Sequence, residues 1–193
     1  MRVLLASFRS ADITEPVTLV FCDCHAGAGG AFAPTLPRAG GEACPHDAAA
    51  RIVGSDCEHD LALLKVDGVR NLPVLELGDS GSAAPGDAVI AIGYALGLDG
   101  GPSVTTGIIS ATGRTSIAET GFGTSCRLTN LLQTDAPISS GDSGGPLIDS
   151  GGHVIGINTM VAAPNSQTVV NGISFAIAAD TVKALLPGLR GGG

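Results

Sequence analysis

The chain has 193 residues, of which 44% are hydrophobic and 15% charged, and its net charge at neutral pH is −8. This length suits one domain, or two small lobes that share a core. Its ten basic residues are scattered along an acidic chain, which argues against nucleic acid as a partner. No apolar run approaches the roughly 18 residues of a membrane span, and the apolar start of residues 1–8 is too short for a signal-peptide core of about 7–15 residues. We therefore expect no export signal in the sequence as written.

The first 47 residues differ in character from the rest of the chain. They hold three of the five cysteines and two of the four histidines, with several Gly-Ala runs between them. An odd number of cysteines, most of them in the first third, does not make a convincing disulfide framework. Residues 17–22 form the one clear strand candidate before residue 48, and from there onward the sequence becomes orderly.

Short apolar and β-branched runs, separated by Gly and Pro turns, predict strands through most of the remaining chain. The expected strands are residues 51–54, 61–66, 75–77, 87–93, 103–111, 131–134, 146–149, 154–160 and 172–177. Residues 112–128 are polar and predict an irregular surface loop. Asp180 is the expected N-cap of a short helix that Pro187-Gly188 would end. Many strands and one terminal helix predict an all-β barrel or sandwich.

Ser143 lies in the run Gly141-Asp142-Ser143-Gly144-Gly145-Pro146. A serine hydroxyl is a poor nucleophile unless a base takes its proton and N–H donors face the oxyanion that it creates. The flanking glycines allow a tight turn in which main-chain amides converge on one point. Alternatively, this run is a plain turn between two strands.

Two arrangements can activate a serine nucleophile in such a run. The Gly-x-Ser-x-Gly elbow of α/β-hydrolases needs a helix directly after the serine and a histidine downstream. Gly144-Gly145-Pro146 starts a helix poorly, and the downstream histidine, His153, falls at a hairpin turn, so the elbow fails. In the other arrangement, histidine comes first, then aspartate, then serine. Asp60, directly before the apolar run 61–66, is the best acid, although it could instead be a solvated turn residue.

Several segments together resemble the HtrA/Deg family of trypsin-like serine proteases over about 70% of the chain, in the family's order. They include Asp60-Leu-Ala-Leu-Leu-Lys65, Ala91-Ile-Gly-Tyr-Ala-Leu-Gly97, Val104-Thr-Thr-Gly-Ile-Ile-Ser110, Gly141-Asp-Ser-Gly-Gly-Pro-Leu147, Val154-Ile-Gly-Ile-Asn-Thr159 and Ile173-Ser-Phe-Ala-Ile177. The resemblance implies a chymotrypsin-like double β-barrel with a short C-terminal helix. In this division, residues 1–47 are an atypical or incomplete part of the first barrel, 48–187 are the protease domain, and 188–193 are a Gly-rich tail or linker start.

The resemblance also implies the roles of single residues. Ser143 is the expected nucleophile, Asp60 orients the base, and the amides of Gly141 and Ser143 form the oxyanion hole. A third set, Ile157, Asn158 and Thr159, is expected beside the substrate backbone, with a pocket for a small or medium aliphatic side chain. The family usually has Asn directly before the serine, where this chain has Asp142. We expect that change to be mild, because the position contributes chiefly main chain.

The base histidine is the weak point of the resemblance, because the family's Thr-Asn-x-His-Val-Val-like segment is missing. His25 lies 35 positions before Asp60 and follows the strand candidate 17–22, so it is the working base. His46 and His59 are poorer candidates. Three hypotheses remain for residues 1–47: a diverged first barrel, a wrong or frame-shifted start, and a zinc site. The zinc site would use the soft ligands Cys22, Cys24, His25, Cys44, His46, Cys57 and His59.

The leading functional hypothesis is a serine endopeptidase that needs no cofactor and cleaves unfolded or misfolded polypeptides. The alternative is a protease-fold module that binds exposed polypeptide without cleaving it, because its histidine is missing. By resemblance the protein would act in the cell envelope, and a homo-trimer is the assembly that the family suggests. Family members usually carry a PDZ domain after the protease, and the sequence as written contains none.

Overall fold

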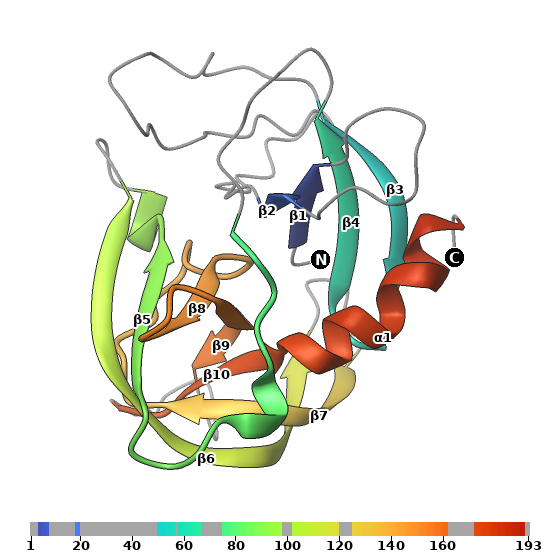
Figure 1. Ribbon diagram of the computed structural model, residues 1–193. Helices are drawn as coiled ribbons and strands as arrows, with labels where there is room; N and C mark the ends of the chain where they lie inside the picture. The colour runs from blue at the N-terminus through green and yellow to red at the C-terminus, as the bar shows by residue number, and fades with distance from the viewer. Residues whose placement is uncertain are drawn as a thin grey trace.

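The computed structural model describes residues 4–7, 18–19, 50–56, 58–66, 75–97, 102–119, 125–161 and 172–191. Strands β5 to β10 form a closed barrel in the order β10-β7-β6-β5-β8-β9, and β1 to β4 form a four-stranded sheet in the order β2-β1-β4-β3. Figure 1 shows the barrel on one side, the sheet on the other, and α1 leading from the barrel to the sheet. Within the described ranges, the expected all-β fold with a C-terminal helix is confirmed, and its first half is an open sheet.

The barrel strands are β5 (Ala88–Gly93), β6 (Ser103–Glu119), β7 (Ser125–Thr134), β8 (Pro146–Asp149), β9 (Val154–Val161) and β10 (Ser174–Ala178). Side chains of alternating positions fill the barrel, since period-two strands send every second residue inward. The interior cluster includes Val89, Ala91, Ile109, Leu132, Leu147, Ile155 and Ala176, each buried. Full burial of an aliphatic side chain of this size contributes about 1.5–3 kcal/mol to stability.

The open sheet consists of β1 (Leu4–Ser7), β2 (Thr18–Leu19), β3 (Ala50–Asp56) and β4 (Leu61–Val66). Its β4 strand has the expected continuous apolar run, and residues 61 to 64 are all buried. Leu61 and Leu63 belong to a second core, outside the barrel, that also includes Ile148, Ile157 and residues of the helix. This second core joins the sheet to the barrel. It therefore places Asp60, directly before β4, against the barrel wall.

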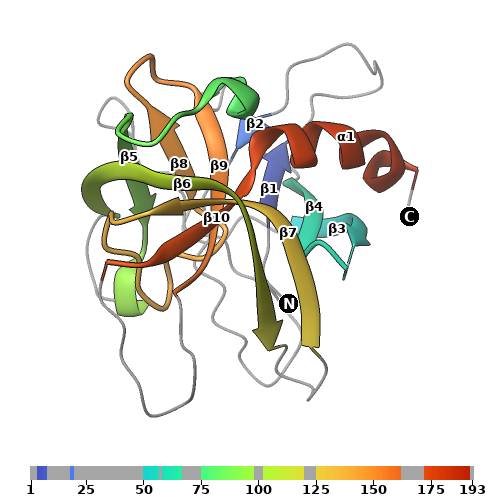
Figure 2. The same cartoon turned by 90° about the horizontal axis from the view of Figure 1, so that it is seen from below.

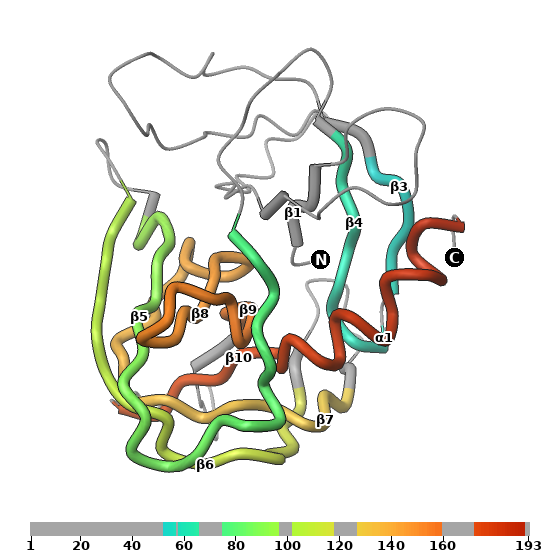
Figure 3. Tube along the Cα trace, viewed as in Figure 1, coloured from blue at the N-terminus to red at the C-terminus, as the bar shows by residue number. Residues whose placement is uncertain are grey.

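Residues 75–87, which lead into β5, run along the boundary of the two halves (Figure 3). Leu77 forms a parallel bridge with Val154 at the start of β9, and two main-chain hydrogen bonds, Gly78 N–H to Val154 O and Val154 N–H to Glu76 O, support it. A one-turn 3-10 helix, η1 (Ser80–Ser82), follows, and a second, η2 (Ala95–Gly97), comes directly after β5. The short strand expected at 75–77 is therefore a single bridge.

Residues 112–128 differ from the expected surface loop. β6 continues to Glu119 and β7 begins at Ser125, with pairs such as Ser116 with Leu128 and Glu119 with Ser125. Figure 2 shows the ends of both strands extending together beyond the barrel. The polar composition indicated a loop, but strand pairing stabilises a polar ribbon that has no apolar face of its own, and three register shifts let it bend.

The helix α1 (Ala179–Arg190) also differs at both ends from the prediction. Its N-cap is Ala178, and the amide of Asp180, expected to be the N-cap, donates instead to the hydroxyl of Ser80 in η1 at 3.0 Å. The helix continues through Pro187, although proline removes one helical hydrogen bond. The last turn is retained because Leu189 is buried in the core and packs its main chain against Gly54 of β3.

Candidate active site

Ser143 is placed by a turn in which glycine is required at two points. Gly141 has φ +97°, and a Cβ there would lie 2.0 Å from the carbonyl oxygen of Tyr94. A Cβ at Gly145 would lie 2.0 Å from the carbonyl oxygen of Ile92. Ile92 lies in β5 and Tyr94 directly follows it, so the serine turn is pressed onto the main chain at the end of this barrel strand. These contacts explain why the sequence has glycine on both sides of Ser143.

Main-chain hydrogen bonds fix the turn from its other side. The Gly144 amide donates to Asn158 O at 2.8 Å, and the Asn158 amide donates to Gly145 O at 2.8 Å. Within the described part of the chain, the amides of Gly141 and Ser143 donate no main-chain hydrogen bond. Two amides with this freedom on one tight turn are what an oxyanion-binding site requires.

Asp60 lies at the start of β4, where it has φ +57°. Aspartate tolerates this left-handed conformation better than most residues, and here the conformation ends the turn 58–60 that joins β3 to β4. The side chain is partly exposed, and its Oδ2 accepts a hydrogen bond from Thr159 Oγ1 at 3.0 Å. A residue of the open sheet is thereby tied to β9 of the barrel.

Thr159 connects the two predicted catalytic positions. Its hydroxyl donates to Asp60, and its main-chain carbonyl accepts a hydrogen bond from Ser143 Oγ at 2.9 Å. Thr159 is only 1% exposed, and both of its hydrogen bonds are partly buried. The structure therefore brings Ser143 and Asp60 to one residue, although they come from different halves of the molecule.

The three residues expected beside the substrate have buried side chains. Ile157 belongs to the core, and Asn158 is 1% exposed, with its Nδ2 donating to the carbonyls of Ile92 and Pro146. Side chains in these positions support the turn and the barrel, so a substrate could reach this strand only through main chain. The role of Ile157, Asn158 and Thr159 in substrate binding stays a prediction.

Asp142 is the residue whose importance the sequence did not reveal. It was expected to contribute chiefly main chain, but its carboxyl is 5% exposed and its Oδ2 accepts the Ser139 amide at 2.7 Å. Its Oδ1 is buried, with no hydrogen-bond partner in the described parts of the chain. Burial raises the pKa of this carboxyl above its ordinary value, and the Ser139 hydrogen bond opposes that rise only in part. No signal in the sequence distinguishes a buried aspartate here from an exposed one.

The remaining predicted positions lie outside the described residues. These are His25, His46, Cys22, Cys24, Cys44 and Cys57. His59 is described, and it is bonded to Asp56 through Nδ1 at 2.9 Å. Among the described residues there is no group of three or more side chains suited to a metal ion. The hypothesis of a zinc site therefore remains untested.

Known proteins resemble this chain along most of its length. A family model described as a trypsin-like peptidase domain matches residues 14–157. The probable periplasmic serine endoprotease DegP-like of Rickettsia prowazekii (strain Madrid E) is 44% identical over 141 residues, which are 73% of this chain and 26% of that protein. The periplasmic serine endoprotease DegP of Escherichia coli (strain K12) is 40% identical over 136 residues, 70% of this chain and 27% of that protein.

Solved structures agree with the sequence relatives. The HtrA-type protease AlgW with decapeptide is 41% identical with a TM-score of 0.62, and the match covers 74% of this chain and 41% of that one. The chain spans about a quarter of the length of the curated relatives. Because the family model covers most of the chain and the relatives are DegP and HtrA proteases, the chain belongs to the trypsin-like peptidase domain family and is of the HtrA/Deg type.

Proposed function

We propose that the protein is a serine endopeptidase that cleaves polypeptides through an acyl-enzyme. The observation that carries the proposal is the convergence of Ser143 Oγ and Asp60 Oδ2 on Thr159, in a chain of the HtrA/Deg type. Packing of the two halves does not by itself require these two hydrogen bonds. A nucleophile and the acid that orients its base do need to be held close together.

In the proposed reaction, Ser143 Oγ attacks the carbonyl carbon of the scissile bond while its proton passes to the base. His25 is the base in this proposal, and the match to the family model begins at residue 14, ahead of it. The carbonyl oxygen becomes an oxyanion, which the amides of Gly141 and Ser143 stabilise. The base then protonates the leaving amine, and water hydrolyses the acyl-enzyme by the same route. Asp60 holds the histidine tautomer and its cationic form.

One step of this reaction needs a local change. The Ser143 hydroxyl donates to Thr159 O in the structure, whereas attack requires that it donate to the base. A rotation about the Cα–Cβ bond of Ser143 is sufficient for this change. The hydroxyl lies in a partly buried site next to Thr159, which is also the hydrogen-bond partner of Asp60. The amides of the turn stay in place during that rotation.

The finer parts of the proposal follow the family resemblance of the sequence. We infer that the substrates are unfolded or misfolded polypeptides, that the side chain before the cleaved bond is a small or medium aliphatic one, that the protein assembles as a homo-trimer, and that it acts in the cell envelope. Two relatives are named periplasmic endoproteases, and AlgW was solved with a peptide. No helix among the described residues is long and apolar enough to cross a membrane.

A fluorophosphonate probe tests the proposal directly, because it reacts with an activated serine. We expect the wild-type protein to be labelled, Ser143→Ala to lose all labelling, and His25→Ala to lose at least 100-fold in labelling rate, in line with the loss of a triad member. Unfolded casein should be degraded and a folded control protein spared. A folded protein that is not labelled would instead favour a module that binds exposed polypeptide without cleaving it.

A further inference from the structure

Asp142 is a buried acid next to the nucleophile, and the proposed reaction assigns it no role. Its two carboxyl oxygens have different surroundings. Oδ2 accepts the Ser139 amide at 2.7 Å, and the Asp142 amide donates back to Ser139 O at 3.1 Å. This reciprocal pair closes the loop that carries Gly141 and Ser143. The side chain of Asp142 therefore sets the position of both amides that would face the oxyanion.

The second carboxyl oxygen, Oδ1, lies against Gly93 at the end of β5. It is buried and has no hydrogen-bond partner among the described residues, and a Cβ at Gly93 would lie 2.5 Å from it. The carboxyl thus packs against the α-carbon of Gly93 at the end of β5. Burying an ionised carboxylate with one oxygen unsatisfied is far more costly than burying the neutral acid. The geometry of this oxygen favours the protonated form.

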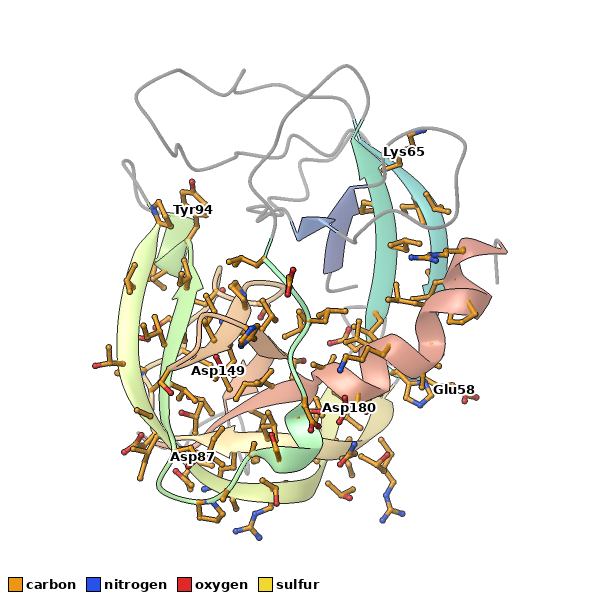
Figure 4. The ribbon with its side chains drawn as sticks, in the orientation of Figure 1. Glu58, Lys65, Asp87, Tyr94, Asp149 and Asp180 are labelled. Atoms are coloured by element: carbon orange, nitrogen blue, oxygen red, sulfur yellow. The ribbon has the colours of Figure 1, made fainter. Side chains whose placement is uncertain are left out.

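Charged groups near Asp142 also favour the neutral acid. Within the described part of the chain, Tyr94 follows β5 as the nearby titratable residue, and the loop 137–145 carries three serines and no charged side chain besides Asp142. Asp60, which accepts a hydrogen bond from Thr159, is a second acidic residue of the site. Lys65, near the end of β4, lies on the other side of the molecule from Tyr94 (Figure 4). Among the described residues, no cation forms an ion pair with Asp142.

We propose that Asp142 is a positioning residue of the serine turn that supports catalysis as a neutral acid, with its proton on Oδ1. The neutral carboxyl keeps the hydrogen bond from Ser139 and so keeps the amides of Gly141 and Ser143 in place. An ionised carboxyl would put a negative charge one residue from Ser143, and it would repel the oxyanion that forms there. This proposal rests on the proposed function, because it concerns the same serine.

The pH dependence follows from the raised pKa of Asp142. The fraction of neutral Asp142 falls as the pH rises, so the wild type loses oxyanion stabilisation towards alkaline pH, while Asp142→Asn is neutral at every pH. We expect the ratio of kcat for Asp142→Asn to kcat for the wild type to rise with pH as Asp142 of the wild type ionises, and to reach on the order of ten once it is ionised. The KM ratio should stay near one. The base titrates in both proteins and cancels in the ratio.

Two further measurements separate positioning from a general loss of fold. Asp142→Ala removes the acceptor for the Ser139 amide, so its kcat should be at least about ten-fold below that of Asp142→Asn at every pH. Thermal unfolding needs no activity, and there Asp142→Asn should be the more stable protein at pH 9, with the difference shrinking towards pH 5. Folding of each variant is verified by circular dichroism.

The outcomes distinguish this proposal from the proposed function. A wild type that fluorophosphonate labels, with a kcat ratio that does not change with pH, overturns the role of Asp142 alone. A ratio below one at every pH, together with lower stability of Asp142→Asn at pH 9, also overturns it, because Asp142 would then be ionised and paired with a cation. A wild type that is not labelled overturns the proposed function and the catalytic role of Asp142 with it, and the unfolding measurement then decides its protonation state.

Discussion

The serine turn and the acid turn are the two halves of the candidate site, and they are held by different kinds of contact. Around Ser143 the closest contacts are between main chains, and at Gly141 and Gly145 an added Cβ would lie 2.0 Å from the carbonyl oxygens of Tyr94 and Ile92. Around Asp60 the contacts are hydrogen bonds of side chains. The Asp56 carboxylate accepts the amides of Glu58 and His59 at 2.9 and 3.0 Å, and Thr159 Oγ1 donates to Asp60 itself.

This difference predicts how each half tolerates change. Main chain pressed against main chain leaves no room for a larger residue, so substitutions in the serine turn should give steep losses. Hydrogen bonds of side chains can be removed one at a time with little change in volume, so substitutions in the acid turn should give graded losses. The four substitutions below test this comparison, from the largest expected effect to the smallest.

Gly141→Ala should produce the largest loss. The new Cβ would lie 2.0 Å from the carbonyl oxygen of Tyr94, and alanine disfavours the φ of +97° at this position. The turn must shift, and the amide of residue 141 moves away from the oxyanion. Loss of one oxyanion donor costs about 100- to 1,000-fold in kcat, and we expect a fall of at least that size in casein cleavage.

The matched control is Gly152→Ala, in the hairpin between β8 and β9. Gly152 also has a positive φ, +84°, but a Cβ there meets nothing within 4 Å. It should lower stability by about 1 kcal/mol and leave kcat unchanged. Equal effects of the two substitutions on kcat would contradict the expectation that changes in the serine turn give steep losses.

Gly93→Ala should give the next largest loss, acting through Asp142. Its Cβ would lie 2.5 Å from both the Cα and the Oδ1 of Asp142, so the aspartate must move and carry the serine turn with it. We expect kcat to fall about 30-fold while KM changes little, since displaced catalytic groups reduce transition-state binding. Gly188→Ala in α1 is the control, because nothing lies within 4 Å of its added Cβ. An unchanged kcat in Gly93→Ala would show that the turn does not depend on β5.

The serine turn could be predicted from the sequence, because its requirements are local. Glycine on both sides of Ser143 is visible in a run of six residues, and the structure explains two of those glycines by close contacts with the main chain of Tyr94 and Ile92. The strands that surround it were also predicted, since apolar runs bounded by Gly and Pro depend on local sequence.

Contacts between distant parts of the chain could not be predicted. The hydrogen bond from Thr159 to Asp60 joins residues 99 positions apart, and no pattern in either segment indicates it. The burial of Asp142 comes from the end of β5, which is also distant from it in sequence. Likewise, the ends of β6 and β7 form strands only because each supplies the other's hydrogen bonds. The base, His25, lies outside the described residues and stays a prediction.

Thr159→Val tests the link between the two halves and should give an intermediate loss. Valine has nearly the shape of threonine and keeps the carbonyl that accepts the Ser143 hydroxyl, but it cannot donate to Asp60. We expect kcat to fall about ten-fold, in proportion to one hydrogen bond to a charged group of about 1.5–3 kcal/mol. Thr159→Ser keeps the hydroxyl and should retain most of the activity. If both variants lose equally, packing rather than the hydrogen bond accounts for the effect.

His59→Gln should have the smallest effect, because it changes the outer side of the acid turn. His59 Nδ1 and Asp56 Oδ2 are 2.9 Å apart on a partly exposed turn. Burial alone would raise the pKa of Asp56, but its hydrogen bonds and its attraction to His59 outweigh burial and lower that pKa. A lowered pKa in the folded protein means that the pair adds stability above pH 4, and that this stability is lost as the pH falls through the lowered value. We expect the substitution to reduce the free energy of unfolding by about 0.5 kcal/mol at pH 7 and by less at pH 3, measured by urea denaturation. Activity should change less than two-fold, since Asp60 keeps its hydrogen bond from Thr159. A ten-fold loss of kcat would show that the acid turn is as sensitive as the serine turn, and the contrast between main-chain and side-chain contacts would then fail.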